Sequence, residues 1–385
     1  MRGRIKLIYF DNAASSFPKP PEVAKAMTKA VNEYGANPGR SGHYLSIYAA
    51  EMVFSCRERI AALFNALLEN VIFTSNATHA INTVLKGALR AGDHIVISDI
   101  EHNAVARPLK VLEDFNITAS LARVDFEDDE KTVKSFEEQI TPQTAMIACT
   151  HASNVTGRIL PIEKIGALAK KHNLMFMVDA AQTAGAHNID VQALNIDFLC
   201  LPGHKGLYGP QGTGLLILNT DKSLKTLTEG GTGGNSFEPL QPIYPPERYE
   251  SGTLNTPGIV GLKEGVNYIL NTGIDKINAY EKELLLYAYD TLSEIKEVKL
   301  YSKRPESFYT AVLPFNIENV HSNIVAEFLN KYGVLTRSGF HCAPSAHLRL
   351  DTVETGAVRM SFGVYNTKQE IKYAANIIKD FIKSK

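Results

Sequence analysis

The sequence predicts an α/β fold with a mostly parallel sheet, and three observations support this prediction. Short apolar runs alternate with longer amphipathic segments from about residue 70 to residue 218. Several of the runs are apolar throughout, as expected for strands that are buried on both faces. The segments between them carry apolar residues at helical spacing. This alternation indicates parallel strands joined by helices that cover both faces of the sheet.

The sequence predicts helices before and between the strands. "PPEVAKAMTKAVNEYG" (20–35) predicts a helix, because prolines stand at its start, a glycine stands at its end and its apolar residues share one face. A helical pattern also runs through "EMVFSCRERIAALF". The stretches "THAINTVLKGALRAG" and "IEKIGALAKKHN" are predicted as helices between strands. The seven predicted strands are 70–74, 93–98, 117–124, 144–150, 174–179, 196–201 and 212–218.

A smaller second domain is predicted for the C-terminal third. The segment 228–258 is dense in glycine and proline and too long for a plain connection, so it is either a functional loop or a boundary. A helical stretch follows at about 259–295, and the remainder mixes strand and helix patterns. We therefore expect a large domain at 15–258 and a smaller α+β domain at 259–385, which also takes up residues 1–14.

Composition narrows the class of protein. The chain has 385 residues and a net charge of −1, so nothing favours nucleic acid or an acidic membrane surface as a partner. No apolar stretch approaches the roughly 18 residues that a membrane helix needs. The start of the chain has only a short apolar run, so we expect no secretory signal. The four cysteines, at 56, 149, 200 and 342, show no paired spacing, which fits a reducing cytoplasm.

Polar residues follow two neighbouring predicted strands. Asp179 ends the run "LMFMVD", and His204 and Lys205 follow "IDFLCL". If these strands are parallel, Asp179 and Lys205 lie at the same sheet edge, where ligands bind in such folds. Pyridoxal phosphate needs a lysine for its Schiff base and an acid against its ring nitrogen. For either residue alone, a surface lysine or a strand-end ion pair is the commoner explanation.

Two further features fit the same cofactor but are weak alone. "NVIFTSNATHAINTVLKGAL" predicts a strand, a polar turn and a helix that starts near Asn76, Ala77 and Thr78. A helix N-terminus is an anion site by geometry and dipole, although many such units bind nothing. His102 follows a third strand, where its ring can stack on a cofactor, although a single histidine is more often structural.

The cysteines divide into two groups. Cys56, Cys149 and Cys200 lie in apolar patterns and are expected in the core. Cys342 lies in the loop "LTRSGFHCAPSAH", where cationic neighbours favour a nucleophilic thiolate, although an isolated loop cysteine is unreactive about as often. Zinc binding by His341, Cys342 and His347 is disfavoured, because no second cluster completes a tetrahedral ligand set.

Together the motifs resemble the class V aminotransferase-like enzymes of pyridoxal-phosphate fold type I, and most closely the cysteine desulfurase and selenocysteine lyase group. The resemblance covers nearly the whole chain. It implies a large domain with a mostly parallel seven-stranded sheet, a smaller α+β C-terminal domain, and pyridoxal 5'-phosphate as cofactor. The matching motifs, in the family's order, are "YFDNAASSFPKPPEV", "GRSGHYLS", "FTSNATHAIN", "EHNAVARP", "HASNVTGRILPI", "VDAAQTAG", "DFLCLPGHKGLYGPQGTG", "RYESGTLNTPGIVGL", "RSGFHCAP" and "RMSFGVYNT".

The resemblance assigns the cofactor contacts. Lys205 matches the Schiff-base lysine and Asp179 the partner of the pyridinium nitrogen. Gln182 matches the donor to the ring hydroxyl oxygen, and His102 matches the ring-stacking histidine, which can also shuttle protons. The phosphate contacts are matched by His204, Ala77 and Thr78, and by Thr253 from the other subunit of a homodimer.

The resemblance also assigns the substrate contacts. Asn154 matches a contact to ring and substrate, and Arg359 matches the arginine that binds the substrate carboxylate. Arg337 and His43 match residues near the substrate. Cys342, within "HCA", matches the cysteine that carries a persulfide.

Two positions depart from the family's pattern. Pro202 stands where relatives often have a serine, and Ala77 stands where a threonine is usual. Two hydroxyl donors to the phosphate are therefore missing. We expect a weaker phosphate site unless Thr78, Ser75 or backbone groups compensate.

The implied function is a pyridoxal-phosphate-dependent cysteine desulfurase. L-Cysteine would become L-alanine, and its sulfur would remain on Cys342 as a persulfide for an acceptor protein. Iron–sulfur cluster assembly, tRNA thiolation and selenium metabolism stay open as destinations. The alternatives are a selenocysteine lyase, a class V aminotransferase that acts on a small amino acid without a reactive thiol, and a non-catalytic partner, against which Lys205 argues.

Overall fold

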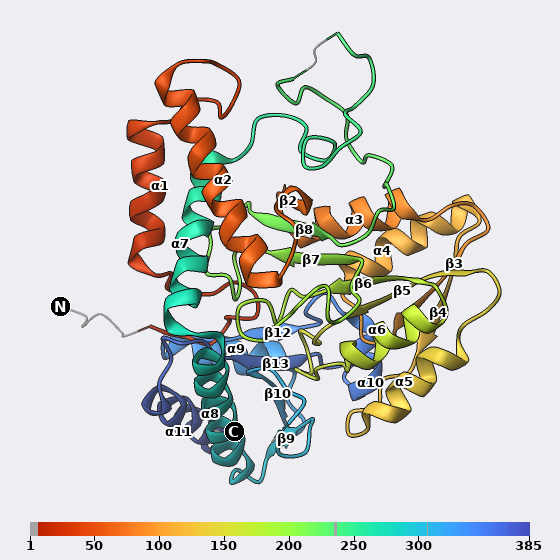
Figure 1. Ribbon diagram of the computed structural model, residues 1–385. Coiled ribbons are helices and arrows are strands. Elements are labelled where there is room, and N and C mark those ends of the chain that lie inside the picture. Colours follow the sequence, from red (N-terminus) through yellow and green to blue (C-terminus); the bar gives the residue numbers. More distant parts are fainter. Residues whose placement is uncertain (1–6, 235–236, 306) are drawn as a thin grey trace.

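The computed structural model describes residues 7–234, 237–305 and 307–385. Its centre is a seven-stranded sheet with the strand order β2-β8-β7-β6-β5-β3-β4 (Figure 1). Every predicted strand is present: β2 (Val71–Thr74), β3 (His94–Ser98), β4 (Thr118–Ala122), β5 (Thr144–Thr150), β6 (Met175–Asp179), β7 (Phe198–Pro202) and β8 (Gly214–Leu218). β8 runs opposite to the other six strands of this sheet, so the prediction of a mostly parallel sheet is confirmed.

Helices cover both faces of this sheet. α3 (Ala77–Ala88) and α4 (Asn103–Leu112) pack on one face, in a core that includes Ile81 and Leu109. α5 (Asp129–Glu138), α6 (Ile162–Lys171) and α2 (Tyr44–Phe64) contribute to the core on the other face, with Phe136 and Ile165 among its members. Short 3₁₀ turns, η1 (Leu68–Asn70) and η2 (Glu113–Phe115), lead into β2 and β4. The predicted three-layer arrangement is therefore observed.

Three long helices pack together at one side of the sheet (Figure 1). α1 (Pro21–Glu33) and α2 both contact α7 (Thr256–Thr272). α1 begins at the second of two prolines and ends before Gly35, close to the predicted bounds. The predicted helical stretch at 259–295 consists of two helices, α7 and α8 (Ile274–Ser293), because Gly273 between them has a φ of 91°.

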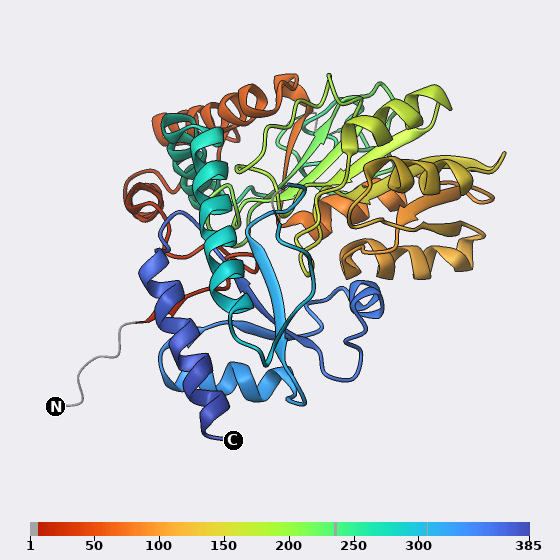
Figure 2. The same cartoon turned by 90° about the horizontal axis from the view of Figure 1, so that it is seen from below.

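A second, antiparallel sheet has the order β12-β13-β10-β9. Its strands are β9 (Val298–Leu300), β10 (Val312–Ile317), β12 (Arg337–Gly339) and β13 (Ala357–Ser361). α8 packs on this sheet together with α9 (Ser322–Lys331) and α11 (Lys368–Lys383), whereas α10 (Pro344–Leu350) follows β12. Figure 2 shows this C-terminal part, in blue, on one side of the larger sheet.

The N-terminal segment joins the C-terminal part. β1 (Ile8–Tyr9) pairs in parallel with β11 (Val334–Leu335), and Phe10 is buried in the second core. The proposed division into 15–258 and 259–385 with 1–14 falls within the first turn of α7; residues 1–6 of that proposal lie outside the described residues.

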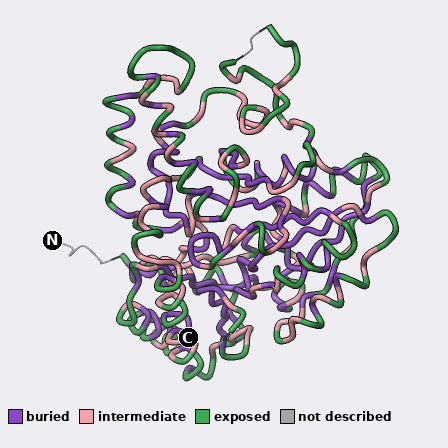
Figure 3. The backbone as a smooth tube through the Cα atoms, in the orientation of Figure 1, coloured by how far each residue is buried: buried purple, intermediate pink, exposed green. Residues whose placement is uncertain are grey.

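Exposure follows this architecture. The strands of the larger sheet are mostly buried, whereas the connection between β8 and α7 projects from the molecule and is largely exposed (Figure 3). Within the described ranges, no helix combines the length and apolar character that crossing a membrane requires.

Candidate active site

Asp179 and Lys205 lie at the same edge of the larger sheet, as predicted. β6 and β7 are parallel, Asp179 is the last residue of β6, and Lys205 comes three residues after the end of β7. Both residues line a cavity of about 220 Å³. The carboxyl ends of the parallel strands therefore form its floor, the place where open α/β sheets bind ligands.

Most of the predicted site residues line this cavity. Its wall is completed by Arg337 from β12 and Arg359 from β13, so the cavity lies between the two sheets. Three predicted residues, His43, Thr253 and Cys342, are not in its lining as far as the described chain extends. The predicted residues that line it are Ala77, Thr78, His102, Asn154, Asp179, Gln182, His204, Lys205, Arg337 and Arg359, together with Pro202.

Burial controls the charge of the central pair. It lowers the pKa of the Lys205 amine to about 8, an effect that Asp179 partly opposes and the Arg359 and Arg337 guanidinium groups increase. Burial also raises the pKa of Asp179, while the Ala181 N–H (2.9 Å from Oδ1) and Lys205 act in the other direction. A lysine with this pKa is a much better nucleophile near neutral pH than an exposed one.

The start of α3 provides an anion site at one end of the cavity. The Asn76 side chain accepts a hydrogen bond from the His79 N–H (2.9 Å), and helix geometry leaves the N–H groups of Ala77 and Thr78 unused by the helix. Gly214 lies against Asn76, where a Cβ atom would come within 2.5 Å of its backbone. Glycine at 214 therefore permits this position of the helix start.

His204 lies close to the anion site. Its Nδ1 atom is buried and has no hydrogen-bond partner among the described residues. Burial, with Lys205 and Lys19 nearby, lowers the pKa of the imidazole to about 4, so it is neutral at pH 7. The Lys19 ammonium donates to the His204 carbonyl (2.6 Å) and fixes the backbone at this point. The orphaned ring nitrogen is suited to a ligand.

His102 is the N-cap of α4. Its Nδ1 atom accepts a hydrogen bond from the Ala104 N–H (3.0 Å), which places the ring proton on Nε2. Burial and then Lys205 lower the pKa of His102 to about 4. The preceding Glu101 is buried and accepts from the Thr150 N–H (2.8 Å). The capping contact fixes the ring orientation at the cavity wall.

Arg359 is held by two acceptors. Its guanidinium donates to Asp11 Oδ1 (2.6 Å) and to the Asn154 carbonyl (2.9 Å), while Nε is buried without a partner among the described residues. Sequence reasoning missed Asp11. Its signal was an acidic residue directly after a short apolar run, within the motif "YFDNAASS".

Cys342 lies in the loop between β12 and α10, with its side chain exposed. An Arg337 Nη2 atom lies 3.7 Å from Sγ, and the Cys342 carbonyl accepts a hydrogen bond from the Asn103 N–H (2.8 Å), next to His102. The thiol is therefore beside residues that line the cavity. Cys56, Cys149 and Cys200 are buried, as predicted.

Two predicted residues lie apart from the cavity in this chain. Thr253 is exposed, and its hydroxyl accepts a hydrogen bond from the Asn37 amide (3.3 Å). His43 is exposed and caps α2 by accepting from the Ser46 N–H (3.3 Å). Across the described ranges, no group of three or more His, Cys, Asp or Glu side chains is arranged to hold a metal ion.

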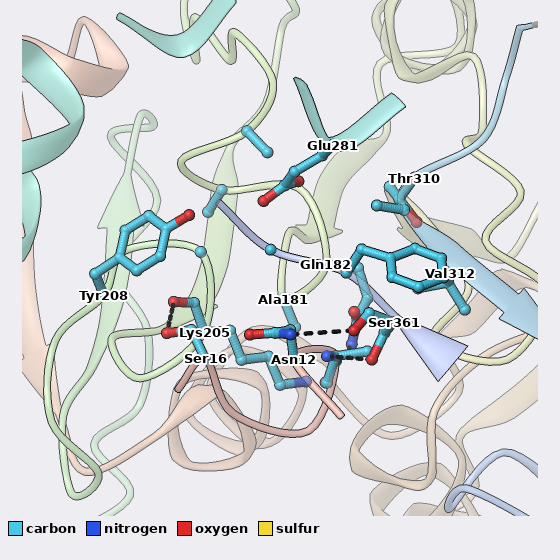
Figure 4. A pocket seen from close by; sticks show the side chains of 17 residues that line it. Asn12, Ser16, Ala181, Gln182, Lys205, Tyr208, Glu281, Thr310, Val312 and Ser361 are labelled. Carbon is cyan, nitrogen blue, oxygen red and sulfur yellow. Dashed lines mark hydrogen bonds between the residues drawn. The ribbon is translucent and has the colours of Figure 1, made fainter. Parts of the chain in front are cut away.

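A second, smaller cavity lies behind the lysine (Figure 4). Lys205 and Gln182 line both cavities and so separate them. The Gln182 amide donates to the Ala13 carbonyl (3.2 Å), and the Ser16 hydroxyl donates to the Lys205 carbonyl (2.8 Å). The segment after β1 therefore supports the backbone on which the lysine stands.

The chain is similar to known proteins over nearly its whole length. Residues 8–373 match the model of the family described as aminotransferase class-V. The chain belongs to that family. It is 34% identical to a probable cysteine desulfurase from Methanothermobacter thermautotrophicus, over 97% of this chain and 94% of that protein. It is 33% identical to a cysteine desulfurase from Salmonella agona, over 95% and 91%.

The solved structures agree with the fold. An apo cysteine desulfurase from Thermococcus onnurineus superposes with a TM-score of 0.91 at 32% identity, covering 98% of this chain and 95% of that chain. These matches confirm the predicted fold class and the resemblance to the cysteine desulfurase group within the class V aminotransferase family.

Proposed function

We propose that this chain is a pyridoxal-phosphate-dependent cysteine desulfurase that converts L-cysteine to L-alanine and keeps the sulfur on Cys342. One observation carries the proposal: an exposed thiol lies 3.7 Å from a guanidinium nitrogen of Arg337, and Arg337 lines the cavity that contains Lys205 and Asp179. An aminotransferase needs the lysine and the acid but has no use for the thiol. Relatives named cysteine desulfurase support the same activity.

The residues present fit pyridoxal phosphate. The Lys205 amine would hold its aldehyde, Asp179 would face its ring nitrogen, and Gln182 would donate to the ring hydroxyl oxygen. The first turn of α3 and the orphaned His204 Nδ1 would hold the phosphate. His102 would cover the ring. When bound, the cofactor withdraws electrons from the α-carbon of the amino acid.

The chain's own residues then perform three tasks. Arg359, which Asp11 and Asn154 hold in place, would bind the substrate carboxylate. The Lys205 amine and the neutral His102 ring would accept and return protons at the substrate carbons. Asn154 would orient the substrate, and Arg337, whose Nη2 atom lies 3.7 Å from Sγ, would hold the Cys342 thiol beside the cavity.

The sulfur step balances without an external oxidant. The Cys342 thiolate attacks the substrate sulfur, an S–S bond forms and the substrate C–S bond breaks. The electron pair of the C–S bond stays with the β-carbon, which takes up a proton and becomes the methyl group of alanine. The enzyme is left with a persulfide, which a sulfur-acceptor protein or an added thiol would reduce.

We further propose a homodimer in which Thr253 contributes to the partner subunit's phosphate site and His43 lies near its substrate. Both residues are exposed in one chain and lie outside its own cavity. The neighbouring loop exposes a group of large apolar side chains that an interface would bury: Phe237, Leu240, Ile243 and Tyr244. The four unpaired cysteines support a cytoplasmic enzyme, where iron–sulfur cluster assembly is one destination for the sulfur.

The decisive experiment supplies the cofactor-loaded protein with L-cysteine and a thiol reductant, and quantifies alanine and sulfide. We expect equal amounts of both, and loss of both in Cys342→Ala. Cys56→Ala, which changes a buried cysteine in α2, is the control and should remain active. Alanine and sulfide formed at the wild-type rate by Cys342→Ala would contradict the thiol's role. Conversion of a small amino acid to its keto acid, without release of sulfide, would favour an aminotransferase. Inactivity with L-cysteine but turnover of selenocysteine would identify a selenocysteine lyase.

A further inference from the structure

The loop that carries Cys342 has an unusual backbone. His341 and Cys342 both have positive φ values, 50° and 58°. Two successive residues other than glycine in the left-handed region are unfavourable unless the surroundings hold them there. The conformation of this turn sets the direction of the Cys342 thiol, so the groups that hold the turn also position the thiol.

Hydrogen bonds to the backbone hold part of this turn. The Asn154 amide donates to the His341 carbonyl (2.7 Å), and the Asn103 N–H donates to the Cys342 carbonyl (2.8 Å). These bonds fix two carbonyls of the loop to the start of α4 and to the loop after β5. They leave the rotation of the His341 side chain, and the distance between the Cys342 thiol and Arg337, to other contacts.

A chain of side-chain hydrogen bonds provides them. His347 Nδ1 lies 2.7 Å from the Thr352 hydroxyl, His347 Nε2 lies 3.3 Å from His341 Nδ1, and His341 Nε2 lies 3.4 Å from the Arg337 carbonyl. The two ring planes are nearly parallel, with 8° between them. His341, His347 and Thr352 are each at most 3% exposed.

The Arg337 carbonyl can only accept, so the His341 proton lies on Nε2 and His341 Nδ1 accepts from His347 Nε2. His347 Nδ1 then accepts from the Thr352 hydroxyl, because each ring carries one proton. Burial lowers the pKa of His341 to about 2 and also lowers the pKa of His347, so both rings are neutral at physiological pH. A neutral imidazole donates from one nitrogen and accepts at the other. Each ring therefore has its donor and its acceptor satisfied by this arrangement, which ends at the residue whose guanidinium contacts the Cys342 sulfur.

We propose that His347 is a positioning residue for Cys342. It does not line the cavity and contacts no reacting atom; it acts by holding His341, and through His341 it keeps the turn and Arg337 in register with the thiol. The proposal rests on the proposed function, in which Cys342 receives the sulfur. It adds a requirement five residues beyond that cysteine, in α10.

The test compares two substitutions of the same residue in the cofactor-loaded protein. His347→Leu removes both hydrogen bonds at similar volume, whereas His347→Gln keeps one donor and one acceptor. For His347→Leu we expect kcat for alanine formation, and the rate of Cys342 alkylation by iodoacetamide, to fall about tenfold or more, because small displacements of a reacting group are costly. KM should change by less than about threefold, and His347→Gln should recover most of both rates.

A matched control separates positioning from general destabilisation. His94 is also buried and hydrogen-bonded through both ring nitrogens, to Thr144 (2.8 Å) and Ser120 (2.9 Å), but it stands at the opposite end of β3 from His102. His94→Leu should keep the wild-type alkylation rate. Equal losses in His94→Leu and His347→Leu, or equal losses in His347→Leu and His347→Gln, would overturn the proposal. So would a wild-type rate of alkylation in His347→Leu.

If His347→Leu does not fold, Thr352→Val serves instead. It removes the hydroxyl that begins the chain and should slow Cys342 alkylation in the same direction; an unchanged rate would overturn the proposal. Alkylation reports the placement of the thiol whether or not the thiol receives sulfur. Alanine production that persists in Cys342→Ala would therefore reject the proposed function, while the alkylation rates would still decide the role of His347.

Discussion

Arg359 and Asp11 are 348 positions apart in the sequence, yet an Nη2 atom of Arg359 lies 2.6 Å from Oδ1 of Asp11. The arginine side chain is 1% exposed and the aspartate side chain 22%. The pair joins β13 to the segment after β1 at the wall of the cavity. A buried guanidinium needs such a partner, because an unpaired buried charge is strongly destabilising. The N-terminal segment is therefore part of the candidate active site.

Asp11→Asn is expected to raise the KM for L-cysteine by about tenfold or more, since a charge-assisted hydrogen bond contributes about 1.5–3 kcal/mol. The arginine loses the partner that fixes its position for the substrate carboxylate. Steady-state alanine formation would measure the change. Glu127→Gln removes the exposed ion pair with Lys303 and serves as the control, with KM expected to stay at the wild-type value. A wild-type KM in Asp11→Asn would show that Arg359 does not depend on this contact.

The pKa of Lys205 predicts the pH dependence of cofactor attachment. Only the neutral amine attacks an aldehyde, and burial lowers the pKa of Lys205 to about 8. The rate at which the apo protein binds pyridoxal phosphate should therefore rise from pH 6 and reach half of its plateau near pH 8. Asp179 raises the pKa of this lysine, so Asp179→Asn should move the midpoint to lower pH. Absorbance changes during reconstitution would measure both profiles.

Lys19 is the control for this profile, because burial also lowers its pKa to about 8 and it lies close by, on the His204 carbonyl. Lys19→Gln should leave the midpoint in place. A midpoint that moves in Lys19→Gln but not in Asp179→Asn would show that Lys19 titrates instead of Lys205, which would refute the prediction.

Local patterns were enough to place the first half of the site at one edge of the sheet, whereas the roles of its residues were expected from the family resemblance. Asp179, Lys205 and His102 follow strands that the apolar runs identify, and a parallel sheet brings strand ends together. The direction of β8 was also open to prediction. The connection 203–213 has no helical pattern, and a parallel partner needs a crossover of a dozen or more residues.

The second half depends on contacts between distant segments. Arg359 lies in the strand "AVRMS", where one charge in an apolar run signals a special residue but not its partner. Its two acceptors come from the segment after β1 and from the loop after β5. Likewise the bond between His341 and His347 depends on α10 turning back over the loop. No periodicity in the sequence predicts these contacts between distant residues.

Hydroxyl groups added at the proposed phosphate site should raise the affinity for pyridoxal phosphate. Pro202 ends β7 and Ala77 begins α3, and both line the cavity at positions where the resemblance led us to expect hydroxyl groups. The double variant Pro202→Ser and Ala77→Thr should bind pyridoxal phosphate about tenfold or more tightly, because it adds hydrogen bonds to a charged group. Fluorescence titration of the apo protein would give the dissociation constants.

Ala88→Thr changes the other end of α3 and should leave the dissociation constant unaltered. An unchanged constant in the double variant would mean that backbone donors, Thr78 or Ser75 already complete the site.

The last prediction concerns acid stability and rests on His151. Its ring is buried edge-to-face against His187, its Nδ1 atom has no partner among the described residues, and burial lowers its pKa to about 3. Between pH 6.5 and pH 3 the unfolded chain therefore binds one more proton than the folded chain at His151, so the stability that the neutral ring contributes is lost as the pH falls.

Glu101 and Glu281 have the opposite effect on the pH dependence of stability, because burial raises their pKa values to about 8. Each variant must therefore be compared with the wild type. His151→Leu should lose less stability between pH 7 and pH 5 than the wild type, by up to about 1.4 kcal/mol per pH unit below pH 6. Urea unfolding at pH 7, 6 and 5 would measure this difference. Identical pH dependence in His151→Leu and the wild type would show that His151 is protonated in the folded protein as readily as in the unfolded chain.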